Sequence, residues 1–424
     1  MNQQNVTVQR VAWSDLFPFA ILLRTLPLAA SFSVWSLAWI GVLLSPVGWF
    51  LLKLVFIAND DFKTNPELIA SVQNQTSPFR GVLDADGPLR FGLDVQIGNR
   101  ISLGPLAAFQ KVTEPFWRWF EWHSSWRHAA FWMLGGVWTL VVWSFIGCAI
   151  VRTCLVRLAR DEHLGIDEAA EFAFNKFTTA LTALAVPLFA VTLLAVPGWF
   201  AGWVMRADIG LALVSVGWVF VLVLSAGMVA LLAGWLLGWP LILAGLSADK
   251  VKAIDSMTRV YAFIFQKPIN YAFYILLAVL FSGVCWQVVS VLATNTVQLA
   301  YWSTSWSHGD SPENHRAVVA SGSQGDELLD SLQPSPWVVF GGNAIRFWNG
   351  AILSLAVAFL YGHCWALAAA IFLLMRRDVD QVEFDEMFMP EDELSYPLPP
   401  LVTDERGIPT IQPLNDGPND THES

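Results

Sequence analysis

Few side chains in this sequence could do chemistry, and most of those lie where apolar segments end. His363, next to Cys364, is the exception, because it is the only ionisable side chain other than cysteine deep within an apolar run. An ionisable residue at such a position is by default a functional-site hypothesis. A proton-binding or ligand-binding role for His363 therefore stands against a structural role, in which a neutral imidazole hydrogen-bonds to a neighbouring helix.

A second polar candidate lies in the segment LSADKVKAIDSMTRVYAFIFQKP, residues 246–268. Apolar residues recur there at helical spacing from Val251 to Phe265, while Asp255 and Arg259 lie on the opposite face. The two charges are four residues apart and can pair, but such a contact contributes only about 0.2–0.5 kcal/mol. The segment therefore predicts an amphipathic helix in the membrane interface plane.

Other combinations of polar residues do not have the spacing of a metal-binding or disulfide motif. His123 and His128 are five residues apart, not the three or four that place two metal ligands on one helical face. The four cysteines lie in or at the ends of apolar runs and form neither a disulfide framework nor a zinc motif. The sequence predicts no catalytic, cofactor-binding or metal-binding residue, and we expect the protein not to be an enzyme.

The amino-acid composition indicates that these residues lie on the helices of a membrane protein. Apolar residues make up 55% of the 424 residues and charged residues only 14%, whereas soluble domains carry about 25% charged residues. The 22 tryptophans indicate the same class, since tryptophan gathers at membrane interfaces. We therefore predict an all-α, polytopic transmembrane bundle.

Six apolar runs are long enough to cross the bilayer, which takes about 20 helical residues. Their predicted bounds are 34–57, 129–151, 179–205, 218–246, 269–293 and 347–375. Amphipathic helices at 13–26, 166–177 and 251–265 precede the first, third and fifth runs, so three units of interfacial helix plus hairpin are a possible repeat. Six aromatic side chains between Phe116 and Trp126 predict a lipid-surface anchor.

The run between Asp208 and Asp249 has 40 residues without a charge, which as a helix is about 60 Å long. It holds either two crossings or one crossing plus a half-helix. Basic clusters on both sides favour a single crossing at 218–246, with a half-helix at 209–216.

Charge predicts the orientation and the partners. Twelve Lys and Arg residues lie on the predicted inner side and three in the short outer connections, so both termini are expected in the cytoplasm and the protein in the inner membrane. Residues 1–33 form the cytoplasmic N-terminus and 34–377 the membrane domain, with outer loops 59–128 and 294–346. The tail 378–424 has thirteen acidic residues and one basic residue. It is expected to be a disordered, solvated segment, and docking of a basic cytoplasmic protein is the functional alternative. The remainder is too weakly basic to bind nucleic acid.

Four segments resemble an uncharacterised family of multi-pass membrane proteins from planctomycete-type bacteria, which is distantly similar to the membrane domain of glycerophosphodiester phosphodiesterases. These segments are GWFLLKLVF at 48–56, GPLAAFQKVTEPF at 104–116, LLGWPLILAGLSADKVKAIDSMTRVYAFIFQKP at 236–268 and LLMRRDVDQVEFDEMF at 373–388. The third is the most specific, although Val260 replaces a serine of the family pattern. The resemblance implies a six-helix bundle and carries no activity.

Three classes of function stay open at this point. A scaffold or accessory protein fits the scarcity of buried charge best, and membrane lipids are its expected partners. A transporter of a lipid or apolar solute fits the broken helices and the long uncharged run, and it predicts a polar or water-lined cavity between the repeats. An intramembrane enzyme fits least well. A solidly packed centre would favour the scaffold, and a cavity that reaches His363 would favour transport.

Overall fold

The protein is a polytopic helical bundle, as the sequence predicts. The computed structural model describes residues 17–57, 66–79, 82, 97–121, 126–249, 251–305, 336–382, 384, 401–403 and 409–411. Six of its helices are long and apolar enough to cross a membrane. They are α3 (Phe32–Phe56), α7 (Trp126–Arg160), α8 (Ile166–Val204), α10 (Trp218–Ala248), α12 (Pro268–Ser305) and α15 (Pro336–Asp380).

Shorter elements connect these helices. The 3-10 helix η1 (Pro18–Arg24) and α2 (Thr25–Ala29) precede α3, while α5 (Pro66–Thr76) and α6 (Ile97–Arg118) lie between α3 and α7. The helices α9 (Asp208–Val216) and α11 (Ala253–Gln266) flank α10. Two three-residue strands, β1 (Leu401–Thr403) and β2 (Pro409–Ile411), pair in antiparallel fashion within the acidic tail. The rest of the tail beyond 384, and the first 16 residues, lie outside the described part of the chain.

The predicted division of the long uncharged run is confirmed. Gly217 separates the short helix α9 from the crossing α10, and Pro240 lies inside α10 without ending it. The predicted amphipathic helix at 166–177 is not a separate element. It forms the first third of α8, and no break separates it from the membrane-crossing part of that helix. Residues 174–180, FNKFTTA, contain neither glycine nor proline, so nothing in this sequence interrupts the hydrogen-bond ladder.

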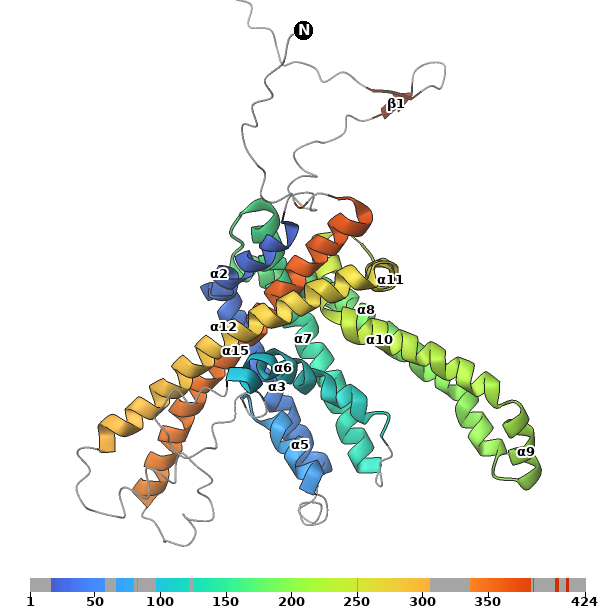
Figure 1. The fold of residues 1–424 in the computed structure, drawn as a ribbon, viewed down its shortest axis with the longest axis horizontal. Helices are drawn as coiled ribbons and strands as arrows, with labels where there is room; N and C mark the ends of the chain where they lie inside the picture. Colours follow the sequence, from blue (N-terminus) through green and yellow to red (C-terminus); the bar gives the residue numbers. More distant parts are fainter. Residues whose placement is uncertain are drawn as a thin grey trace, which may run out of the picture.

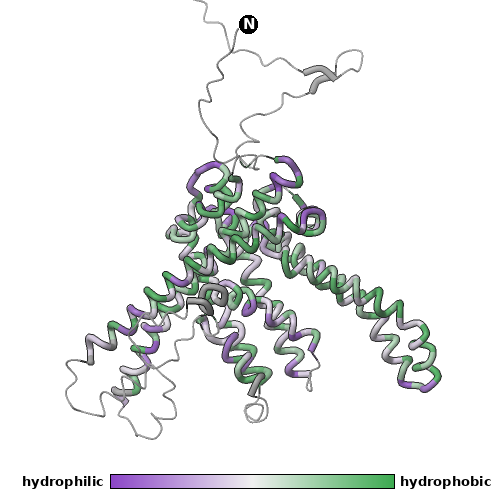
Figure 2. Tube along the Cα trace, in the orientation of Figure 1, coloured by the Kyte–Doolittle hydropathy of each residue, from purple (hydrophilic) through white to green (hydrophobic). Residues whose placement is uncertain are grey.

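The helices meet at one end and diverge toward the other (Figure 1). At the closed end lie α11 and the connection from α7 to α8. Away from it, α12 runs beside α15 and α8 runs beside α10, with α3 and α7 between these two pairs. The diverging helices are apolar along most of their length, and hydrophilic residues gather near helix ends (Figure 2). The central helix is α15, which contacts α3, α7, α10 and α12.

Tryptophan rings packed against glycines hold α3 and α7 together. Trp49 of α3 is 1% exposed, and a Cβ atom added to Gly135 of α7 would lie 2.0 Å from its ring. The contact is reciprocal, since a Cβ atom on Gly48 of α3 would lie 2.2 Å from Trp138 of α7. Small residues permit such close approach of membrane helices.

Tryptophan thus has a second role besides the interfacial one that the composition suggests. Among the described residues, seven tryptophans are buried within the bundle: Trp49, Trp132, Trp143, Trp235, Trp239, Trp286 and Trp365. Others, such as Trp126 and Trp199, are exposed near helix ends. Glycine supplies the space that a ring such as that of Trp49 needs between two helices.

The long first loop contributes to the bundle through α6. This helix lies across the bundle among the diverging helices and packs mainly against α12 and α7 (Figure 1). At its end, Phe116 is buried and packs against Trp119 and Trp235, with ring centroids 5.2 and 4.8 Å away. Trp117 and Phe120 are exposed. The aromatic segment therefore joins helices as well as presenting rings outward.

Candidate functional site: an apolar cavity between diverging helices

A cavity of about 340 Å³ lies where α10 and α12 separate. Its walls come from α6, α10, α12 and α15, together with Trp143 of α7. Ligand pockets in proteins typically have volumes of about 300–1,000 Å³. The cavity is therefore large enough for a small ligand or for part of a lipid.

The helices that form the walls keep the cavity open. Pro105 in α6 and Pro240 in α10 line it, and α10 and α12 diverge beside it (Figure 1). Leu106 and Leu237 line the cavity and are also 54% and 43% exposed on the outside of the bundle. The cavity is therefore open at the side of the bundle, next to Leu237 of the candidate membrane-spanning helix α10.

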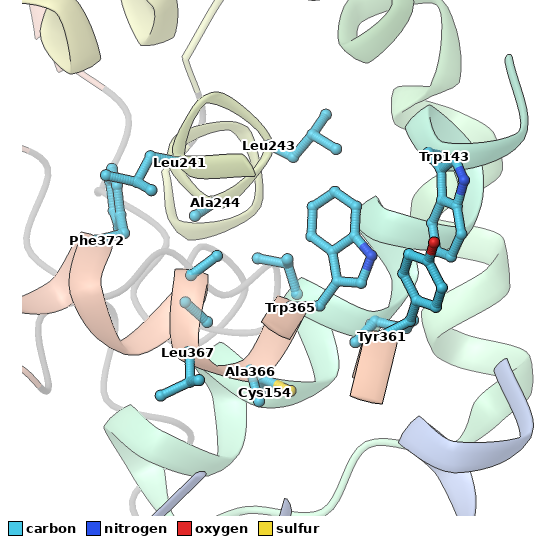
Figure 3. Packing of buried hydrophobic residues seen from close by; sticks show 14 of the residues in the cluster. Trp143, Cys154, Leu241, Leu243, Ala244, Tyr361, Trp365, Ala366, Leu367 and Phe372 are labelled. Carbon is cyan, nitrogen blue, oxygen red and sulfur yellow. The ribbon is translucent and has the colours of Figure 1, made fainter. Parts of the chain in front are cut away.

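Aromatic side chains form the inner wall. Figure 3 shows Trp143 and Tyr361 lying ring to ring, with Trp365 beside them in α15. The centroids of Trp143 and Tyr361 are 4.9 Å apart with an interplanar angle of 25°, and the centroids of Trp365 and Trp239 are 5.1 Å apart at 86°. These large rings, each locked by its neighbours, make a rigid apolar surface.

Few polar atoms face this surface. The hydroxyl of Tyr271 donates to the Leu237 carbonyl at 2.6 Å, and that of Tyr361 donates to the Ala108 carbonyl at 3.3 Å. The indole Nε1–H of Trp239 is buried without an acceptor among the described residues. A buried donor without a partner is costly, so a ligand that brings a hydrogen-bond acceptor to this site would be favoured.

A second, much smaller cavity of about 30 Å³ lies behind the aromatic wall. Lys111 of α6 lines it, and its Nζ donates to the Ser77 carbonyl at 2.6 Å. Burial lowers the pKa of the Lys111 amine to about 7, and this exceeds the opposing attraction of Glu114. Glu114 is itself held by Arg118 at 3.6 Å and by Gln75 at 3.0 Å.

The predicted partners Asp255 and Arg259 are not joined by an ion pair in the described part of the chain. Asp255 is exposed in the first turn of α11, whereas Arg259 reaches Asp249 at 2.5 Å and Asp380 at 3.5 Å. Arg376 also contacts Asp249, at 3.2 Å. These charges are partly buried, where pairing is stronger than on an open helix face. Arg259 therefore ties the end of α10 to the end of α15.

His363 lies in the middle of α15 and is fully buried. Its Nε2 is 3.2 Å from the hydroxyl of Thr25, which donates to the Leu22 carbonyl at 2.6 Å. The hydroxyl has only one proton, so Nε2 carries the hydrogen that it donates to Thr25. The rings of Phe281 and Phe359 flank the imidazole. His363 joins α15 to α2 and does not line the cavity, although its neighbour Cys364 does.

Sequence reasoning misses the residues that make the site. Tyr361 carries the one signal available, a hydroxyl in the middle of an apolar crossing that must find a partner. Lys111 belongs to a segment that the sequence places in an outer loop, and nothing in its spacing predicts burial beneath α15. Trp239 precedes Pro240, and the pair predicts only a bend in the helix.

Comparison of the chain with protein-family models, with curated proteins and with solved structures finds no match. The resemblance described above therefore stays a prediction. The six long apolar helices make the chain a multi-pass membrane protein.

Proposed function

We propose that the protein binds a lipid or another apolar molecule, which enters the 340 Å³ cavity sideways from the bilayer. The single observation that carries the proposal is this cavity, bounded by α6, α10, α12 and α15 and flanked by exposed Leu106 and Leu237. Binding of this kind is the first step that a transporter of a lipid or apolar solute requires. The cavity differs from the one that the sequence predicts for a transporter, because its lining is apolar and it reaches Cys364 but not His363.

The volume of the cavity favours an occupant over an empty centre. The lining of the cavity is almost entirely apolar, so an apolar molecule that occupies it gains van der Waals contacts with these side chains. A scaffold, whose centre has only to be packed, has no use for such a space.

We propose further that the closed end of the bundle faces the cytoplasm of the inner membrane. Ion pairs support a common side for the basic clusters, because Arg24 lies 3.4 Å from Asp161 and Arg376 lies 3.2 Å from Asp249. Basic residues are enriched in cytoplasmic connections. In this orientation the cavity lies on the cytoplasmic side of the membrane centre, since Leu237 is in the second half of α10.

Photolabelling in vesicles tests the proposal. Purified protein is reconstituted with a phospholipid that carries a diazirine in one acyl chain, and the labelled peptides are identified by mass spectrometry. Labelling should include residues of the inner wall, such as Trp365 and Cys364, which outer lipids cannot reach. Labelling confined to outward-facing residues would overturn the proposal.

A matched pair of variants sharpens this test. Ala278 of α12 lines the cavity and is 5% exposed, whereas Ala272 on the same helix is exposed on its outer face. Ala278→Phe should fill part of the cavity and suppress labelling of the inner wall. Ala272→Phe adds the same ring on the lipid side and should leave that labelling unchanged.

A further inference from the structure

The second half of α8 has an open face that continues a packed one. Leu184 and Val191 of this helix are 0% and 1% exposed. Gly202 lies about five helical turns beyond Leu184 and so points in nearly the same direction, yet it is exposed. The difference arises because α8 and α10 diverge together from the other helices (Figure 1). The face that packs inside the bundle is therefore uncovered farther along α8.

Two glycines on this open face differ from other glycines of the bundle. A Cβ atom would lie less than 3.0 Å from an aromatic ring at Gly48, Gly104, Gly135, Gly136, Gly147 and Gly234. At Gly198 and Gly202 it would meet nothing within 4 Å. Glycine weakens a helix relative to alanine, and glycines four residues apart let two membrane helices approach closely. We call the surface formed by Ala195, Gly198, Trp199 and Gly202 the arm face.

The arm face also carries a ring of the kind that such glycines receive. The tripeptide Gly-Trp-Phe occurs at 48–50 in α3 and again at 198–200 in α8. In α3 it takes part in the reciprocal ring-on-glycine contact with α7. In α8, Trp199 is 74% exposed and lies beside Gly202, three residues further along the helix. The arm face thus presents both halves of such a contact, so a second copy of the same face complements it.

Two charges at the end of the arm fit the same partner. Arg206 lies between α8 and α9, Asp208 begins α9, and both are exposed. Neither forms an ion pair within the described part of the chain. When two copies of α8 lie side by side in one membrane, Arg206 of each is near the depth of Asp208 of the other. Exposed pairs of this kind add little affinity, but they favour one orientation.

We propose that two copies of the chain associate in the membrane through the arm face of α8, related by a twofold axis. Trp199 of each copy lies over the glycines of the other, and Arg206 of each pairs with Asp208 of the other. Acyl chains can cover any apolar face, so contact with lipid requires neither the glycine spacing nor the exposed ring beside it. The inference goes beyond the proposed function, because the walls of the 340 Å³ cavity come from other helices.

Counting of photobleaching steps in vesicles tests the association. The full chain, with one fluorophore at its C-terminus, is reconstituted over a series of protein-to-lipid ratios, and the fraction of two-step spots gives the dissociation constant. Gly202→Leu should raise this constant at least about tenfold, because the added side chain prevents close approach of the two helices. Gly341→Leu in α15 is the matched control. A Cβ atom at Gly341 also meets nothing within 4 Å, so this variant should dimerise as the unmodified chain does.

Two milder substitutions separate the glycine from the ring. Gly202→Ala should leave the dissociation constant nearly unchanged, since alanine is also among the small residues found where membrane helices meet. Trp199→Ala should raise it, because the ring that fills the space over the glycines is lost. An unchanged constant for Trp199→Ala would exclude the ring-on-glycine contact between copies.

Cysteine cross-linking locates the contact. Ala195 is exposed on the arm face. Phe200 is 56% exposed and lies at a similar depth on nearly the opposite side of α8. Oxidation in the membrane should join Ala195→Cys chains into dimers and leave both Phe200→Cys and the unmodified chain as monomers on a denaturing gel. Cross-linking of Phe200→Cys without Ala195→Cys, or an unmodified chain that bleaches in one step at every dilution, overturns the proposal.

Discussion

One added methyl group at Gly135 should weaken the contact between α3 and α7. A Cβ atom there would lie 2.0 Å from the Trp49 ring, and distances under 3.0 Å essentially never occur, so the ring must move by about 1 Å. It has little room, because Phe131 and Trp132 pack against it at 5.2 and 5.6 Å between centroids. Overpacking of this kind costs about 1–3 kcal/mol, and the helix gains only about 0.5–1 kcal/mol when Gly becomes Ala. We expect a net loss of about 1–2 kcal/mol for Gly135→Ala.

Thermal unfolding in detergent measures this loss of stability, with size-exclusion chromatography as the readout. Gly202→Ala in α8 is the control, because a Cβ atom there meets nothing within 4 Å, and it should be neutral or slightly stabilising. In a chain that already carries Trp49→Leu, the added cost of Gly135→Ala should disappear. Equal effects at Gly135 and Gly202 would refute the ring-on-glycine packing.

Two further predictions concern charge. Lys111→Met removes an amine, and burial lowers the pKa of that amine to about 7 in the folded protein. Between pH 7 and about pH 10.5 the unfolded chain therefore binds one more proton than the folded chain. The free energy of unfolding of the unmodified protein, relative to that of the variant, should rise over that range and stay constant below about pH 7. Melting curves at pH 6, 7.5 and 9 measure the difference, and parallel profiles would contradict it. Arg259→Ala leaves Asp380 without this partner and should lower the free energy of unfolding by about 1 kcal/mol, since Arg259 is one-third exposed. This loss of stability should diminish in 1 M salt. A loss that does not depend on salt would exclude the ion pair as its cause.

Much of the fold can be predicted from periodicity and charge alone. Basic clusters that must share a side divide the uncharged run of 40 residues into a half-helix and one crossing, and α9 and α10 separate at Gly217 accordingly. The prediction of an independent helix at 166–177 is wrong, because a change from amphipathic to uniformly apolar sequence does not end a helix when no glycine or proline intervenes.

The site cannot be predicted in the same way. A cavity depends on where helices diverge, and local spacing in α10 or α12 carries no record of the distance between them. The pairing of Arg259 illustrates the same limit: sequence offers Asp255 four residues away, but the bundle brings Asp249 and Asp380 closer. His363 stands out in the sequence because it is ionisable, yet the cavity lies on the side of α15 lined by Tyr361 and Cys364.

Native mass spectrometry of protein released from its own membrane tests the central claim most directly. If the cavity holds an apolar molecule of the bilayer, the unmodified chain and Ala272→Phe should each retain one such molecule per chain after extensive detergent exchange, and Ala278→Phe should retain none. Equal retention by all three proteins, or an empty unmodified chain of normal stability, would contradict a lipid-binding cavity.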